Sequence, residues 1–138
     1  MCSRSSCHRG VWLLLLAAVL RAQPRPAEIE LLQPLPEIEL SAAERFAVVT
    51  VLFRNCGEQT LQVYSVRSEC WCAAVTVLRG SVPPDSVGMM RVMLTAAGLG
   101  QEPRARLRFR LESNACNSPF VFELTVHRRD AGGELERP

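Results

Sequence analysis

Cys70 and Cys72, separated by one residue, are the pair of side chains in this chain best suited to chemistry. Thiolate sulfur combined with imidazole or thioether is the ligand set that suits Cu(I) or Zn²⁺. We expect His127 and Met93 to approach the same end of the fold, because the strands that carry them run toward it. The main interpretation is that both cysteines are buried apolar side chains or form a local disulfide, and that His127 is a solvated strand end. The alternative is a small copper-binding or thiol-redox protein that uses this set.

Two further cysteines, Cys56 and Cys116, follow residue 22, and four cysteines allow three complete pairings. With the strands taken in order, Cys56 and Cys116 fall in connections at the same end of the fold. Cys70 and Cys72 lie beyond a strand of six residues, about 20 Å away. Because a disulfide requires Cα atoms within about 7 Å, we predict a Cys56–Cys116 bond. Bonding of Cys70 or Cys72 to Cys116 is the alternative.

Residues 1–22 resemble a signal peptide. Arg4 and Arg9 precede an uninterrupted apolar run, VWLLLLAAVL, over residues 11–20. A transmembrane helix needs about 20 apolar residues, so this run is too short to span a membrane comfortably. We therefore expect export to the periplasm or the extracellular space, where disulfides are chemically allowed. An uncleaved N-terminal anchor is the alternative, and no other membrane contact is expected.

The charge of the chain after residue 22 argues against a nucleic-acid partner. All sixteen basic residues are Arg; thirteen of them, with all fourteen acidic residues, follow residue 22, which gives a net charge of −1. A nucleic-acid-binding surface would need a basic excess. The same part of the chain has one histidine, no Ser/His/Asp set and no Gly-rich phosphate loop. We expect no catalytic activity.

Hydrophobic alternation indicates strands throughout. Residues 104–111 alternate Arg with Ala, Leu or Phe, which is typical of a strand with one buried face and one solvated face. Other strands are expected over residues 27–32 and 37–40 (one edge strand broken by Pro34 and Pro36), 45–54, 61–66, 70–78, 87–95 and 120–126. About seven strands without a helical period predict an Ig-like antiparallel β-sandwich. Side chains of Glu58, Glu112 and Glu123 are expected to neutralise part of the arginine row, which we interpret as a solvated face.

The turn over residues 55–57 carries two structural candidates, Asn55 and Gly57. Asn can hydrogen-bond its own downstream backbone, and Gly can take a positive φ without a Cβ clash. The turn is part of a longer motif, Phe53-x-Asn55-x-Gly57-x-x-x-Leu61-x-Val63-x-x-Val66-x-x-x-Cys70-x-Cys72.

This motif resembles the signature of the bacterial family called domain of unknown function 1573. The resemblance extends over roughly residues 37–127, with Ser113-Asn114 where the family has a late Ser-Asn turn. Two positions depart from it: Trp71 stands where a small residue is usual, and Pro83-Pro84-Asp85 stands where Pro-Gly is usual. The resemblance implies an exported Ig-like domain without an established activity.

The expected organisation has four parts: a signal peptide (1–22), an extended linker and broken edge strand (23–36), an Ig-like domain (37–127) and a disordered tail (128–138). The predicted function is an exported structural or protein-interaction module. It would bind an unknown protein partner through its loops or by adding a strand at a sheet edge. Copper binding or thiol-redox chemistry at Cys70 and Cys72 is the second hypothesis.

Overall fold

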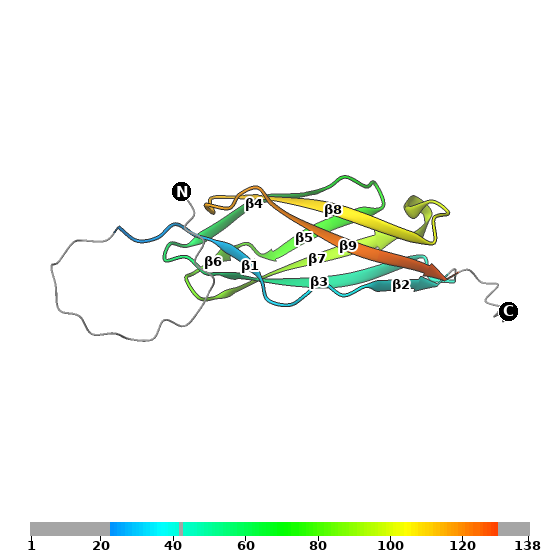
Figure 1. The fold of residues 1–138 in the computed structure, drawn as a ribbon, viewed down its shortest axis with the longest axis horizontal. Coiled ribbons are helices and arrows are strands. Elements are labelled where there is room, and N and C mark those ends of the chain that lie inside the picture. Colours follow the sequence, from blue (N-terminus) through cyan, green and yellow to red (C-terminus); the bar gives the residue numbers. More distant parts are fainter. Residues whose placement is uncertain (1–22, 42, 130–138) are drawn as a thin grey trace.

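The computed structural model describes residues 23–41 and 43–129, which form two stacked β-sheets elongated along their strands (Figure 1). The first sheet has the order β1-β3-β7-β5, and the second has the order β2-β9-β8-β4-β6. The strands of the first sheet are β1 (Ile29–Leu31), β3 (Phe46–Asn55), β7 (Val87–Thr95) and β5 (Ala73–Arg79). The strands of the second sheet are β2 (Ile38–Ser41), β9 (Phe120–Arg129), β8 (Arg104–Ser113), β4 (Leu61–Ser68) and β6 (Ser81–Val82). One 3-10 helix, η1 (Ala96–Leu99), leads from β7 toward β8. The predicted Ig-like sandwich is confirmed.

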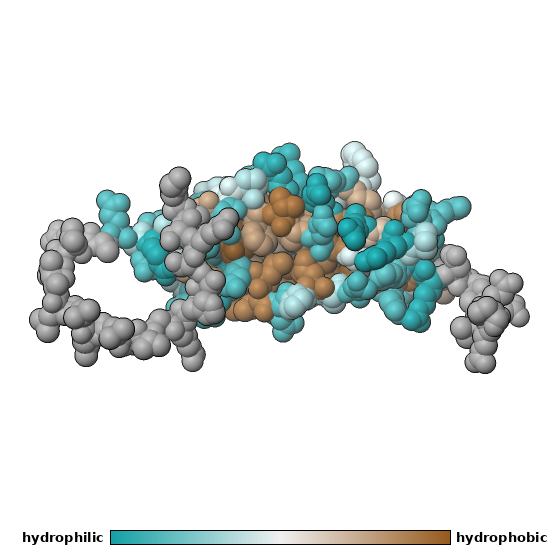
Figure 2. Space-filling model, viewed as in Figure 1, coloured by the Kyte–Doolittle hydropathy of each residue, from teal (hydrophilic) through white to brown (hydrophobic). Residues whose placement is uncertain are grey.

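The core lies between the two sheets and is built by strict alternation. Every second residue of β7, and of β8 from Leu107 onward, is buried, because successive side chains of a strand point to opposite faces. The rings of Phe109 and Phe122 stack in this core with centroids 5.0 Å apart. Figure 2 shows hydrophobic residues gathered in the middle of the molecule and hydrophilic residues toward both ends.

The N-terminal edge strand is divided between the two sheets. β1 pairs with β3 antiparallel, whereas β2 pairs with β9 in parallel, so the sandwich is not antiparallel throughout. Pro34 and Pro36 lie in the connection, where the chain passes from the first sheet to the second. The chain continues in the same direction after Pro36, and therefore meets β9 running the same way. Proline suits this connection because it has no N–H to donate to a ladder.

Two other predictions were wrong. No strand was expected between residues 78 and 87, but Ser81 and Val82 form β6 and pair with β4. The tail was expected from residue 128, but Arg128 and Arg129 extend β9, because β2 provides the partners Leu40 and Ser41. The predicted signal peptide and most of the predicted tail lie outside the described residues.

Candidate interaction surface and the two ends of the sandwich

The sandwich has two ends of different character. We call one the Asn55 end; it comprises the turn at residues 55–57, the entering segment 25–28 and the connection 114–119. The other, the Cys70 end, comprises the turn at residues 70–72 and η1. In Figure 1 the entering segment and the connection between β8 and β9 lie on the left, and the turn between β4 and β5 lies on the right with η1.

Asn55 joins three segments at the Asn55 end. Its side chain is fully buried. Nδ2 donates to the carbonyls of Gln59 at 2.7 Å and Val82 at 2.9 Å. Oδ1 accepts from the amides of Gly57 at 3.0 Å and Glu28 at 3.3 Å. Four bonds use the whole hydrogen-bonding capacity of an asparagine side chain, so the turn, β6 and the entering segment are held at one point.

Gly57 is required by close approach rather than by a positive φ. A Cβ atom at this position would lie 2.0 Å from the carbonyl oxygen of Pro26 and 2.6 Å from Cα of Ala27. No side chain fits there without moving the backbone of the entering segment. The Asn-x-Gly spacing therefore combines a buried hydrogen-bonding centre with a position open to a crossing chain.

The entering segment runs between β3 and the connection that follows β8. Cys56 N donates to Glu28 O and Cys116 N donates to Ala27 O, both at 2.8 Å. Consecutive carbonyls of an extended segment point to opposite sides, so this segment lies between the two cysteines. Both cysteines are oxidised and belong to this end. Their pairing with each other stays a prediction.

Cys70 and Cys72 form a disulfide with their Cα atoms 5.1 Å apart. They were expected within a strand beginning at residue 70, but β5 begins at Ala73. The reason is local: Ala73 N donates to Cys70 O at 3.3 Å, and Cys72 N lies 3.1 Å from Cys70 Sγ. These contacts close a turn, and a turn brings the two Cα atoms closer than the roughly 6.6 Å between alternate residues of a strand.

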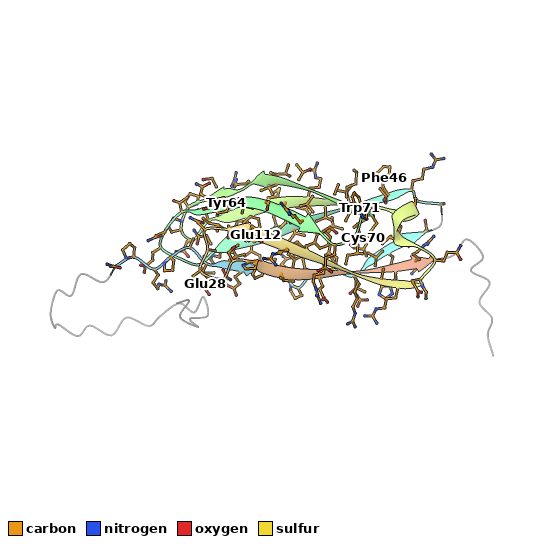
Figure 3. The ribbon with its side chains drawn as sticks, turned by 90° about the horizontal axis from the view of Figure 1, so that it is seen from above. Glu28, Phe46, Tyr64, Cys70, Trp71 and Glu112 are labelled. Atoms are coloured by element: carbon orange, nitrogen blue, oxygen red, sulfur yellow. A yellow bond between two sulfur atoms is a disulfide. The ribbon has the colours of Figure 1, made fainter. Side chains whose placement is uncertain are left out.

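Backbone from η1 and β7 supports this disulfide. A Cβ atom at Gly98 would lie 2.6 Å from Cβ of Cys72, so glycine allows the backbone to pack directly on the cysteine. Thr95 N donates to Cys72 O at 2.7 Å. Cys72 is buried, whereas the side chain of Trp71 is fully exposed. Figure 3 shows Trp71 and Cys70 at one end of the molecule, with Phe46 near them in this view and Glu28 at the other end.

The other proposed copper ligands, His127 and Met93, lie in different sheets, on β9 and β7. Nε2 of His127 lies 2.7 Å from the carboxylate of Glu37, across the β2–β9 edge of the second sheet. Met93 lies on the outer face of the first sheet, between Val48 and Ala74. In residues 23–41 and 43–129 no group of three or more His, Cys, Asp or Glu could hold a metal ion. Metal ligation requires thiolates, so copper binding would need prior reduction of the disulfide; it stays a prediction.

The arginine row of β8 forms a solvated face with carboxylate neighbours. Arg108 pairs with Glu123 at 3.2 Å, Arg110 pairs with Glu112 at 2.6 Å, and all four side chains are exposed to a third or more. The expected role of Glu58 was wrong, because its carboxylate bonds Arg25 at the Asn55 end. The Arg25 backbone N–H, which donates to Glu58 at 2.8 Å, lowers the pKa of that carboxyl group, and the Arg25 side chain lowers it further.

β5 is an open edge of the first sheet. Among the described residues its only strand partner is β7. Its sequence, AAVTVLR, contains no proline and no charge before Arg79. Because the carbonyl of Cys72 points toward β7, alternation directs the backbone groups of Val75 and Val77 to the open edge. The other edge of this sheet is β1, which has only three residues and continues into the proline-containing connection.

Apolar side chains also occupy the outer face of the first sheet. Val48 lies opposite Met93, and Leu52 lies opposite Met89. The exposed large apolar side chains on this face are Phe46, Val48, Leu78, Met89 and Met93. With the open edge of β5, this face forms the candidate interaction surface. The sequence predicted these residues as strand positions, but the order of the strands, which decides which edge is open, was not predictable from it.

No family model and no curated protein matches this chain. A protein of unknown function from Porphyromonas gingivalis W83 matches in structure with a TM-score of 0.58 and 14% identity, over 75% of this chain and 46% of the other. The YadV chaperone matches with a TM-score of 0.48 and 14% identity, over 76% of this chain and 53% of the other. The ASH / PapD-like domain of human CEP192 matches with a TM-score of 0.48 and 11% identity, over 90% of this chain and 99% of the other. The chain thus spans about half of the first two proteins. These likenesses concern the fold; the relation to domain of unknown function 1573 stays a prediction.

Within the described residues, no helix is long and apolar enough to cross a membrane.

Proposed function

We propose that this protein is an exported protein-interaction module that binds an extended segment of a partner along β5. Strand addition at an exposed edge obtains its affinity from main-chain hydrogen bonds and its specificity from alternate side chains. The observation that carries the proposal is the open edge of β5. It has seven residues, no proline and a single charge at its end.

An edge of this kind is unusual in a soluble protein. Exposed edges are commonly blunted by shortness, proline, lysine or a covering loop, since they template pairing with other chains. This molecule uses those devices at β1, which is short and followed by Pro34 and Pro36. It does not use them at β5. The contrast supports a binding role for β5.

The side chains beside the edge support the same interpretation. Val75 and Val77 pair with Val92 and Met90, which are fully buried. The two valines are only half-buried. A partner strand with apolar residues at alternate positions would cover them and contribute about 25 cal/mol for each Å² of apolar surface removed from water.

The proposal is tested with a random peptide library displayed against the full chain. We expect enrichment of peptides with alternating apolar residues, and loss of their binding to the Val75→Pro variant. Proline at residue 75 removes an N–H that faces the open edge and leaves the β5–β7 hydrogen bonds in place. Thermal unfolding of Val75→Pro verifies that the variant is folded.

Alternate N-methylation of a selected peptide is the matched control. In an added strand, only every second N–H points toward the edge, so methylation of one set must abolish binding while methylation of the other set is tolerated. Two outcomes would overturn the proposal. One is the absence of any peptide that depends on the Val75 amide; the other is equal tolerance of both methylated sets.

A further inference from the structure

β5 is suited to pair with its own copy. We infer that a second copy of this chain is the partner strand, paired antiparallel about a twofold axis through Thr76. This inference rests on the proposed function, because it needs the open edge of β5 to accept a strand. The first sheet of one copy and the first sheet of the second copy would then form one continuous sheet across the axis. A twofold interface of this type uses the same surface on both copies.

The backbone groups match this pairing. Around the axis, Thr76 faces Thr76 of the second copy, and Val75 faces Val77. Val75 and Val77 direct their N–H and C=O groups to the open edge, so this pair exchanges two hydrogen bonds on each side of the axis. Thr76 directs its backbone groups toward β7 and forms the close, non-bonded pair at the centre.

The side chains are also self-complementary. Ala74 faces Leu78 of the second copy on the outer face, so that a small residue lies opposite a large one on both sides of the axis. Val75 and Val77 meet on the inner face, and each half-buried valine becomes covered. A bulge between Val77 and Arg79 interrupts the regular register of β5, so Arg79 lies beyond the regularly paired residues and the two arginines are at opposite limits of the paired region. No like charges meet in it.

The same pairing brings the exposed side chain of Trp71 close to a hollow on the second copy. A hollow of about 260 Å³ is lined by Leu78, Arg79, Val87 and Met89. Antiparallel pairing brings the start of one β5 beside the end of the other, and so brings the second copy's Trp71, which precedes β5, toward Arg79. The exposed indole can fill the hollow and stack on the guanidinium group. Buried tryptophan and arginine are the residues most often found as interface anchors.

A matched pair of lysine variants tests whether two copies pair through β5 with Thr76 at the twofold axis. Thr76 and Thr50 are both exposed on the outer face and flank Arg91 from either side. Thr76→Lys places two like charges directly opposite each other at the axis, whereas Thr50→Lys places the same charge one strand beyond β7. In sedimentation equilibrium of the full chain, we expect a wild-type monomer–dimer equilibrium, at least tenfold weaker association of Thr76→Lys, and unchanged association of Thr50→Lys.

Trp71 provides an independent measurement. The chain has two tryptophans, at residues 12 and 71, so Trp12→Phe leaves one indole. We expect its emission to shift to the blue as protein concentration rises, and Trp71→Ala to weaken dimerisation at least tenfold. A monomer at all concentrations, or a dimer indifferent to Thr76→Lys, would overturn the inference. If the chain is monomeric but still binds peptides through the Val75 amide, only the identity of the partner is wrong; if that binding is also absent, the proposed function fails with it.

Discussion

The two ends of this sandwich are held together by different means. At the Asn55 end, one buried side chain makes four hydrogen bonds, and the entering segment crosses over a glycine. At the Cys70 end, a disulfide closes a loop of three residues over the backbone of η1. The Asn55 end, which also contains the oxidised Cys56 and Cys116, joins distant parts of the sequence, whereas the Cys70–Cys72 bond joins neighbours. We therefore expect the Asn55 end to contribute more to the stability of the fold than the Cys70–Cys72 bond.

The exposed side chains do not follow this division. Ion pairs lie at both ends, with Arg25 bonded to Glu58 at the Asn55 end and Arg129 lying 2.7 Å from Glu39 near the other end. Exposed apolar side chains are spread along the sandwich, and the fully exposed Trp71 lies at the Cys70 end. An exposed aromatic side chain of this kind favours contact with another protein.

Replacement of Asn55 should give the largest loss of stability. Asn55→Ala leaves two carbonyls and two amides without their partner, and a buried unsatisfied group costs about 1–3 kcal/mol. We expect the free energy of unfolding to fall by about 3–5 kcal/mol in urea titrations.

Asn114→Ala is the control, because Asn114 is exposed and its side chain makes two bonds, to Gln62 N and Thr60 O. Water can replace them, so a loss of about 1 kcal/mol is expected. Equal losses in the two variants would contradict a special role of the buried asparagine.

Removal of the Cys70–Cys72 bond should have a smaller effect. The loop-closure entropy of a three-residue loop corresponds to about 1.5 kcal/mol. We expect the double variant Cys70→Ser, Cys72→Ala to unfold in urea with a loss near this value and to keep its β-sheet circular dichroism. A loss as large as that of Asn55→Ala would show that the disulfide, too, stabilises the whole fold.

The pH dependence of Glu58 should be the smallest effect. Its pKa is lowered from an ordinary value of 4.5, mainly by the Arg25 backbone N–H. A lowered pKa in the folded state stabilises the fold above the unfolded-state pKa, and this contribution disappears as the pH falls through the folded-state value. Glu58→Gln should therefore flatten the stability profile below about pH 4.5. Identical slopes in the variant and the wild type, measured by urea titration at several pH values, would exclude this contribution.

The parts of the fold that follow a simple period were predictable. β7 begins and ends where its alternation predicted, and β8 begins at the first alternating arginine. β6 was missed because two residues are too few to show a period. The turn at Cys70 was missed because Gly98 and Thr95, far along the sequence, hold it in place. An asparagine at residue 55 predicted a turn. Its hydrogen bonds to Glu28 and Val82 were not predictable, because each of these residues lies 27 positions away in the sequence.

The path of the chain also has a mechanical consequence. The described chain enters at the Asn55 end and leaves from β9 at the opposite end (Figure 1). A pulling force on the two ends therefore acts along the strands. The parallel ladder between β2 and β9 would be loaded in shear, with its hydrogen bonds sharing the force, instead of opening one bond at a time. The parallel ladder is therefore suited to resist a force applied along the length of the sandwich.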